Sequence, residues 1–122
     1  MSPAGDRLRE IARQTASALP GVSHGRPFTP ALDVYKVAGK VFLIITDDPD
    51  EQIITVTCEP ERTRAQVHGH SSITPGRYLD KRHWISLGPG PGTTGRLVTD
   101  AVVDSCDLVV ERLPRRDRPR TR

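Results

Sequence analysis

The two ends of the chain carry apolar residues at helical spacing. Near the N-terminus, this spacing predicts an amphipathic helix that begins at Ser2-Pro3 and ends before Pro20-Gly21. Serine can cap the start of a helix and proline fits its first turn, whereas Pro20-Gly21 breaks the helix. Near the C-terminus, a wider stripe predicts a largely buried helix from Thr94 or Gly95 to Leu113. The positions that define the two stripes are Leu8, Ile11, Ala12, Thr15 and Leu19, then Val98, Ala101, Val102, Ser105 and Val109.

The middle of the chain has the pattern of strands. Apolar and β-branched residues at 32–37, 41–46 and 53–58 are separated by Gly39 and by an acidic turn, so they predict three consecutive antiparallel strands. The strand at 41–46 is apolar on both faces, which places it inside the sheet rather than at an edge.

The remaining segments complete an α+β order. A short helix is expected at 61–67, a turn that finishes as a strand at 73–87, and a Gly- and Pro-rich loop at 88–92. Because the strands cluster without regular βαβ alternation, the order predicts a two-layer sandwich with helices packed on one face of an antiparallel sheet.

Composition predicts a single intracellular domain. A chain of 122 residues suits one core, and its longest apolar run, Val41 to Ile45, is far short of the roughly 20 residues that cross a bilayer. The first residues lack the pattern of a signal peptide, and the two cysteines, Cys58 and Cys106, are too few for a disulfide framework. We therefore expect a cytoplasmic protein with no membrane partner and two buried thiols.

The positive charge is concentrated at the C-terminus. The net charge is +3, but residues 111–122 hold six arginines against two acids, which leaves residues 1–110 at −1. The segment 114–122 has almost no apolar residue to bury, so the sequence predicts a domain at 1–113 and a basic, disordered tail at 114–122. Such a tail could contact phosphates without specificity, or only aid solubility.

Patterns that would indicate catalysis are absent from the sequence. The loop at 88–95 lacks the lysine of a phosphate-binding loop, and His68 with His70 matches no standard zinc spacing. The acidic run from Asp47 to Glu51 is best interpreted as a solvated turn, and no serine has a nucleophile-elbow context. The sequence therefore predicts a non-enzymatic protein without a metal or cofactor.

The segment Arg77 to Trp84 combines cations with aromatic rings, as nucleic-acid-binding surfaces do. It predicts phosphate contacts from Arg77, Lys81, Arg82 and His83, and ligand contacts from Trp84 and Tyr78. The alternative is that Trp84 belongs to the core and that the charged residues are the exposed ends of the same strand.

Three stretches resemble a known family. Residues 58–62, 74–84 and 104–109, with Lys81-Arg82-His83-Trp84 as the most specific element, resemble the MmcQ/YjbR family over residues 8–113. The resemblance implies a CyaY/frataxin-like sandwich of the double-wing type and a DNA-binding accessory or regulatory role on double-stranded DNA.

Two other functions stay open at this stage. The nearly neutral domain would suit a protein that binds or sequesters a small hydrophobic ligand, as in a natural-product or resistance pathway, and the sheet edge or Trp84 could form an interaction surface. The sequence does not determine the oligomeric state.

Overall fold

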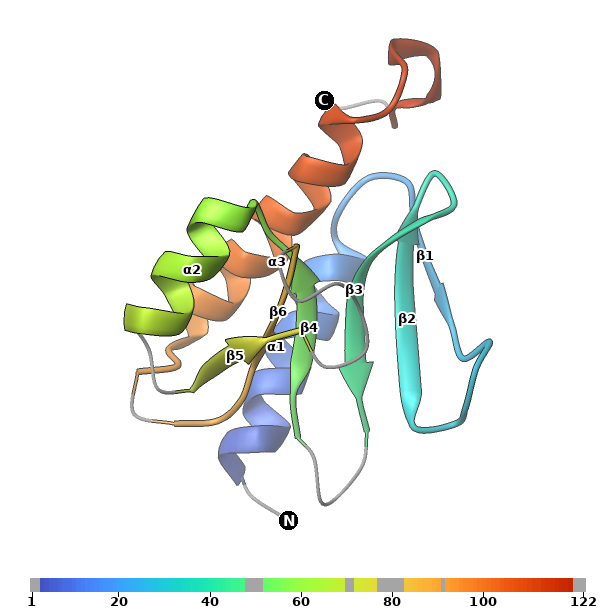
Figure 1. Ribbon diagram of the computed structural model, residues 1–122. Coiled ribbons are helices and arrows are strands. Elements are labelled where there is room, and N and C mark those ends of the chain that lie inside the picture. The colour runs from blue at the N-terminus through green and yellow to red at the C-terminus, as the bar shows by residue number, and fades with distance from the viewer. Residues whose placement is uncertain (1–2, 48–51, 70–71, 77–82, 91, 120–122) are drawn as a thin grey trace.

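The computed structural model describes residues 3–47, 52–69, 72–76, 83–90 and 92–119 (Figure 1). Three α-helices and six strands are followed by a short 3-10 helix near the C-terminus. In chain order they are α1 (Pro3–Ser17), β1 (Val22–Gly25), β2 (Leu32–Val37), β3 (Lys40–Thr46), β4 (Ile54–Thr57), α2 (Pro60–Gly69), β5 (Ile73–Pro75), β6 (Trp84–Leu87), α3 (Gly95–Glu111) and η1 (Arg115–Asp117).

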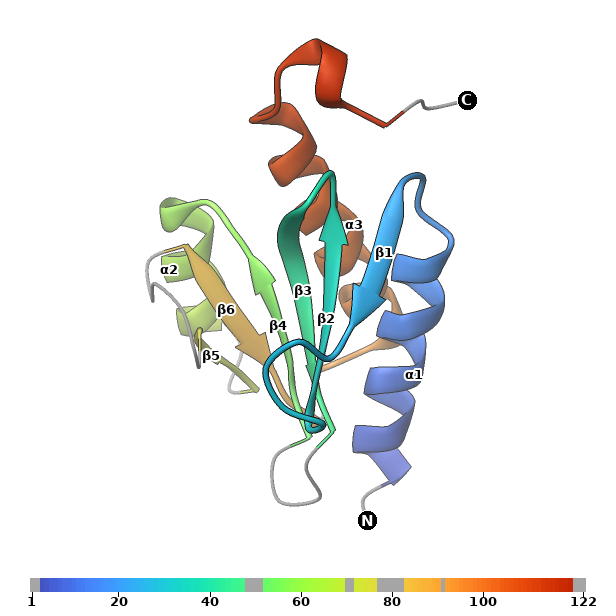
Figure 2. The ribbon, with the colours of Figure 1, turned by 90° about the vertical axis from the view of Figure 1, so that its right-hand side faces the viewer.

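The six strands form one open sheet in the order β1-β2-β3-β4-β6-β5, and every neighbouring pair is antiparallel. The helices pack on one face of this sheet, with α1 and α3 side by side (Figures 1 and 2). The structure thus confirms the predicted α+β sandwich. It also confirms the interior place of β3, whose neighbours are β2 and β4.

The core lies between the sheet and helices α1 and α3. On the sheet, the pairs Leu43 with Val56 and Ile45 with Ile54 present apolar side chains to the helices because alternate residues of a strand share a face. The helices contribute residues from the stripes that the sequence predicts. These buried helix residues are Leu8, Ala12 and Ala16 from α1, and Val98, Val102 and Cys106 from α3.

The connection between β2 and β3 is the predicted hairpin. Val37 pairs with Lys40, so only Ala38 and Gly39 form the loop, and both have positive φ angles, 50° and 78°. Two-residue loops of this kind match the twist of the flanking strands. A glycine satisfies the second of these positions without strain.

The first strand, β1, is missing from the sequence-based prediction. Its four residues are mostly exposed and polar, and they pair with β2 at the edge of the sheet, from Val22 with Val37 to Gly25 with Val34. An edge strand of this kind buries too little to produce an apolar alternation, so only the backbone pairing reveals it.

The segment 73–87 forms two strands rather than the single strand predicted. Strand β5 pairs with β6 from Ile73 opposite Leu87 to Pro75 opposite Ile85, and the amide N of Gly76 donates to the carbonyl of Trp84 at 2.7 Å. The connection between them, residues 77–82, lies outside the described residues. Strand β6 inserts between β4 and β5, an order that no local pattern encodes.

Asp47 is part of a charged network, whereas the sequence analysis treats it as part of a solvated turn. Its carboxylate accepts from Nη1 of Arg9 at 3.2 Å, from Nη2 of Arg13 at 2.6 Å and from Nη2 of Arg26 at 2.7 Å. The first two arginines come from α1 and the third from the loop after β1. This one carboxylate therefore links the first helix, the end of β3 and the edge of the sheet.

Residues 114–119 of the predicted tail follow α3 directly. They include η1, and Nη2 of Arg118 donates to the carbonyl of Glu111 at 3.0 Å. The division into a domain at 1–113 and a disordered tail at 114–122 stays a prediction. Among the described residues, no helix is both long and apolar enough to pass through a membrane.

Candidate ligand-binding groove

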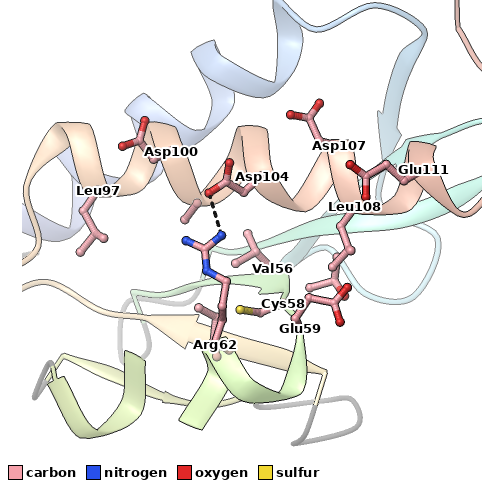
Figure 3. A pocket seen from close by; sticks show the side chains of 13 residues that line it. Val56, Cys58, Glu59, Arg62, Leu97, Asp100, Asp104, Asp107, Leu108 and Glu111 are labelled. Atoms are coloured by element: carbon pink, nitrogen blue, oxygen red, sulfur yellow. Dashed lines mark ion pairs between the residues drawn. The ribbon is translucent and has the colours of Figure 1, made fainter. Parts of the chain in front are cut away.

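A groove with a volume of about 540 Å³ lies between α2 and α3 (Figure 3). Strands β4 and β6 form its floor, helix α3 forms one wall, and the start of α2 forms the other. Its volume falls in the range of roughly 300–1,000 Å³ typical of small-molecule sites.

The floor of the groove is largely apolar. Val56 of β4 and Ile85 of β6 are paired neighbours, and both face the helices because they occupy equivalent positions in the strand alternation. Helix α3 adds Leu97, Ala101 and Leu108, which recur at helical spacing and are only partly buried. Because Val56 and Ile85 are buried, at 1% and 3% exposure, the accessible apolar surface of the groove comes from these α3 side chains.

The rim of the groove is acidic. Asp100, Asp104, Asp107 and Glu111 follow one another at intervals of four, three and four residues, which places them along one side of α3. Glu59, just before α2, adds a fifth carboxylate from the opposite wall. The only cation among the described lining residues comes from α2, which leaves the rim with a local excess of negative charge.

That cation, Arg62, spans the groove. Its Nη1 lies 3.6 Å from Oδ2 of Asp104, and Figure 3 shows the guanidinium extending from α2 toward α3 above the thiol of Cys58. The two side chains are 61% and 52% exposed, so their ion pair is worth at most about 1 kcal/mol. The bridge can therefore open at little cost.

Arginines outside the groove pair with two more rim carboxylates. Arg112 lies 3.5 Å from Glu59, and Arg96 lies 3.8 Å from Asp100. Within the described part of the chain, no ion pair is formed by Asp107 or Glu111. Asp107 and Glu111 are thus rim carboxylates without an ion pair among the described residues, although Arg112 and Arg118 come close to this end of α3.

The groove lies where β4 separates from β3, and a buried hydroxyl holds the two strands at this point. The last ladder pair is Leu43 with Val56; beyond it, the Ser105 hydroxyl donates to the carbonyl of Phe42 at 2.6 Å and accepts from the amide of Thr57 at 3.0 Å. The serine of α3 therefore replaces a direct bond between the strands and attaches the helix wall to the floor.

The two thiols have different environments. Cys58 is half-buried and lines the groove, whereas Cys106 is buried on the core side of α3. Burial, with a smaller effect from the charge of Asp107, raises the pKa of the Cys106 thiol to about 11. Because the thiolate is the reactive form, Cys106 should be inert at neutral pH, while Cys58 is positioned to report on occupation of the groove.

Most of the sequence-predicted site residues lie outside the described residues: Arg77, Tyr78, Lys81 and Arg82. His83 and Trp84 are described, and both are half-buried. The carbonyl of His83 accepts from the amide of Cys58 at 2.6 Å and from the hydroxyl of Thr57 at 3.0 Å, so this residue ties β6 to the end of β4.

Trp84 does not line the α2–α3 groove in the described structure. Its neighbour Ile85 does, and successive side chains of a strand point to opposite faces of the sheet. A ligand that contacts Trp84 would therefore bind a different surface from a ligand in the groove. The contacts predicted for Tyr78 and Trp84 stay predictions.

The groove itself was missed by the sequence analysis, although one signal was present. The acidic residues of the last helix repeat with helical spacing, just as its apolar residues do. The sequence did not reveal that α2 lies opposite this acidic side, because that depends on the packing of segments about 40 positions apart.

The two-layer arrangement defines the chain as an α+β sandwich of a class seen in solved structures of low sequence identity. The structure of Deinococcus radiodurans protein DR2400, described as a DUF419 domain, matches with a TM-score of 0.80 and 22% identity, over 86% of this chain and 80% of that one. A protein from Pseudomonas syringae matches with a TM-score of 0.67 and 17% identity, over 88% of this chain and 98% of that one.

Sequence similarity then defines the family. The YjbR family model matches residues 17–108. The uncharacterized protein YbdF of Escherichia coli O157:H7 is 36% identical over 115 residues, which cover 94% of each chain. The chain belongs to the YjbR family, as its resemblance to MmcQ/YjbR proteins indicates.

Proposed function

We propose that this YjbR-family chain is a non-catalytic binding protein that takes a small organic molecule into the α2–α3 groove. The observation that carries the proposal is the combination, in one cavity of about 540 Å³, of an apolar floor with a charged rim. Ligand sites are usually concave and largely apolar, with a few polar groups that orient the ligand. This role corresponds to the small-molecule alternative of the sequence analysis, at a different place in the fold.

The chemistry of the lining supports binding rather than catalysis. The lining includes the Cys58 thiol and the Thr57 hydroxyl, and a nucleophile of either type needs an adjacent base; within the described residues, no hydrogen bond joins either group to an imidazole or to a rim carboxylate. The Thr57 hydroxyl donates to the carbonyl of His83, so its hydrogen is directed into the sheet.

The proposal predicts that filling the groove abolishes ligand binding. Ligands would be found by amide chemical-shift changes with a library of fragment-sized molecules, and hits should shift the amides of residues 56–59 and 100–111. Ala101→Phe, which adds a ring to the α3 wall of the groove, should weaken such a hit by at least about tenfold, or 1.4 kcal/mol. Ala65→Phe, on an exposed position of α2 outside the lining, is the matched control and should bind normally.

Two results would contradict a binding role for the groove. One is a library that contains no fragment shifting the groove amides. The other is a hit that Ala101→Phe and Ala65→Phe affect equally.

DNA binding, the primary hypothesis of the sequence analysis, is the second candidate. Its support is the presence of basic residues at 77–82 in the sequence and the exposure of Arg115 and Arg116 on η1. The acidic rim would repel a phosphate backbone, so contacts with DNA would have to use another surface.

DNA binding is tested by gel shift on random duplex at low salt. If Arg77, Lys81 and Arg82 contact phosphates, log K should fall with log salt with a slope of about 0.9 per phosphate neutralised, and their replacement by alanine should reduce that slope. Replacing Arg115, Arg116 and Arg118 instead separates the contribution of the tail. A negative gel shift with the full chain at low salt would reject the hypothesis.

The interaction-module hypothesis has less support. Among the described residues, Phe28, at 67% exposure, is the one large apolar side chain that is exposed, and isolated exposed apolar residues are common on monomers. Self-association stays a prediction, which sedimentation at high concentration would test.

A further inference from the structure

We infer that the ligand of the α2–α3 groove is an organic cation with an apolar body, such as a protonated amine or a guanidinium joined to a hydrocarbon. This inference rests on the proposed function and adds the chemical class of the ligand. Three observations support it: the acidic rim, the apolar side chains of the lining, and the position of the Arg62 side chain inside the groove.

The rim has the charge that such a ligand requires. Five carboxylates and one guanidinium line the groove in the described structure, although the whole chain carries a net charge of +3. The rim would therefore attract a cation locally, whereas the net positive charge of the whole chain would repel it. Asp107 and Glu111, four residues apart on α3, lie on the same side of the helix, and neither forms an ion pair among the described residues.

The apolar part of the lining explains why the ligand needs an apolar body. Val56 and Ile85 are already buried, at 1% and 3% exposure, so the accessible apolar surface of the groove comes from α3. Leu97, Ala101 and Leu108 are only partly buried there, and a ligand with a hydrocarbon part would remove their exposed surface from water. An inorganic cation would leave this surface hydrated. A ligand with a hydrocarbon part and a charged end would cover these side chains and reach the rim carboxylates together.

The side chain of Arg62 shows the same chemistry inside the groove. Figure 3 shows its aliphatic stem beside Cys58 and its guanidinium directed at Asp104, an arrangement of apolar stem and cationic head. Because this ion pair is largely exposed, a ligand cation could replace it at Asp104 without a large cost. Arg62 is thus an internal competitor for the position that we assign to the ligand's charge.

A metal ion fits the described site less well. Within the described residues, no group of three or more histidine, cysteine, aspartate or glutamate side chains is placed to hold one. The carboxylates of α3 occur at about one per helical turn of 5.4 Å, so they follow the groove rather than converge on a point. A row of charges of this kind suits an extended cation.

The test compares three probes with the same hydrocarbon and different heads: octylammonium, 1-octanol and octanoate. Occupation of the groove is measured as protection of Cys58 from the small neutral reagent methyl methanethiosulfonate, with the site of modification identified by mass spectrometry. Cys106, 5% exposed and with its pKa raised to about 11, serves as the internal unreactive thiol. Octylammonium should protect at a concentration about tenfold lower than octanol, and octanoate should protect least.

Charge variants assign the effect to the rim. Asp107→Asn with Glu111→Gln should weaken octylammonium by at least about tenfold and leave octanol unchanged, because both substitutions remove a negative charge and keep the size of the side chain. The matched control, Glu10→Gln with Asp117→Asn, changes the net charge equally at exposed positions outside the groove. Arg62→Gln should strengthen octylammonium by several-fold, whereas Arg116→Gln should not.

The outcomes separate the two proposals. If none of the three probes protects Cys58, the groove does not bind such molecules and the proposed function fails with the inference. If octanol or octanoate protects as well as octylammonium, the groove binds ligands but the cationic class is wrong. If a peptide of residues 114–122 protects Cys58 in trans far better than octylammonium does, the occupant is a basic polypeptide segment and the small-molecule inference is overturned.

Discussion

Replacing Ser105 with alanine is expected to lower the free energy of unfolding by about 2–4 kcal/mol. The Ser105 hydroxyl is fully buried and serves two backbone groups, the carbonyl of Phe42 at 2.6 Å and the amide of Thr57 at 3.0 Å. Alanine would leave both groups without this partner in a place that water does not reach, and each such group costs roughly 1–3 kcal/mol.

The position of these groups explains why the strands cannot compensate easily. In an unbroken ladder, the pair Leu43–Val56 would be followed by Phe42 opposite Thr57, and the two would bond directly. The inserted hydroxyl keeps them apart, so a direct bond would require β3, β4 and α3 to move together. We expect the groove floor to become more mobile in the variant.

Urea unfolding measures the stability, and hydrogen exchange of the Thr57 amide measures the local effect. Thr99→Ala, a hydroxyl removal on the same helix at a position that is only partly buried, is the matched control and should change stability by no more than about 0.5 kcal/mol. Equal stabilities of the two variants, with unchanged exchange at Thr57, would show that the hydroxyl bridge is unimportant.

Asp47→Asn is expected to cost about 3 kcal/mol at neutral pH, at the lower end of values for breaking a buried ion pair. Asp47 is 23% exposed and accepts from Arg9, Arg13 and Arg26, and the side chain of Arg9 is only 7% exposed. Asparagine keeps the size of the side chain but removes the charge that balances these arginines. The attachment of α1 to the end of β3 should weaken most.

The effect of Asp47→Asn should depend on pH. Burial alone would raise the pKa of the Asp47 carboxyl, but the hydrogen bonds and charges of Arg13 and Arg26 outweigh burial and hold the pKa below its ordinary value of 3.8. A lowered pKa in the folded state means that the stabilisation is complete above about pH 4 and is lost as the pH falls through the folded pKa.

The measurement is urea unfolding of both proteins at pH 7 and at pH 3. The difference in stability between wild type and Asp47→Asn should be largest at pH 7 and smaller at pH 3. The control is Asp117→Asn, which removes an exposed carboxylate 3.9 Å from Arg116 and should change stability by less than about 1 kcal/mol. A difference for Asp47→Asn that grows at low pH would refute the assigned role of the charge.

Local patterns predicted the helices and the interior strands well. The first and last helices have faces that repeat every three to four residues, and they are observed at Pro3–Ser17 and Gly95–Glu111. Strand β3 is apolar on both faces, its residues from Phe42 to Thr46 are all buried, and this pattern predicted its interior position. These elements bury large apolar surfaces, and a buried face requires apolar residues at regular intervals in the sequence.

The edges of the sheet and the candidate site were predicted poorly. Strand β1 buries little, so its residues carry no alternation, and β5 is only three residues long before Gly76. The predicted site was assigned to the basic segment 77–84, most of which lies outside the described residues. The groove could not be predicted because its walls, α2 and α3, are about 40 positions apart in the chain.

The sequence by itself determined the family, the α+β class, the place of β3 and the amphipathic character of α1 and α3, since each depends on residues that are near one another in the chain. Only the tertiary structure decided that β6 lies between β4 and β5, that Ser105 joins β3 to β4, and that Arg62 faces Asp104 across a groove. These features join residues about 30 to 60 positions apart, and such contacts follow from how the whole chain packs rather than from any local preference.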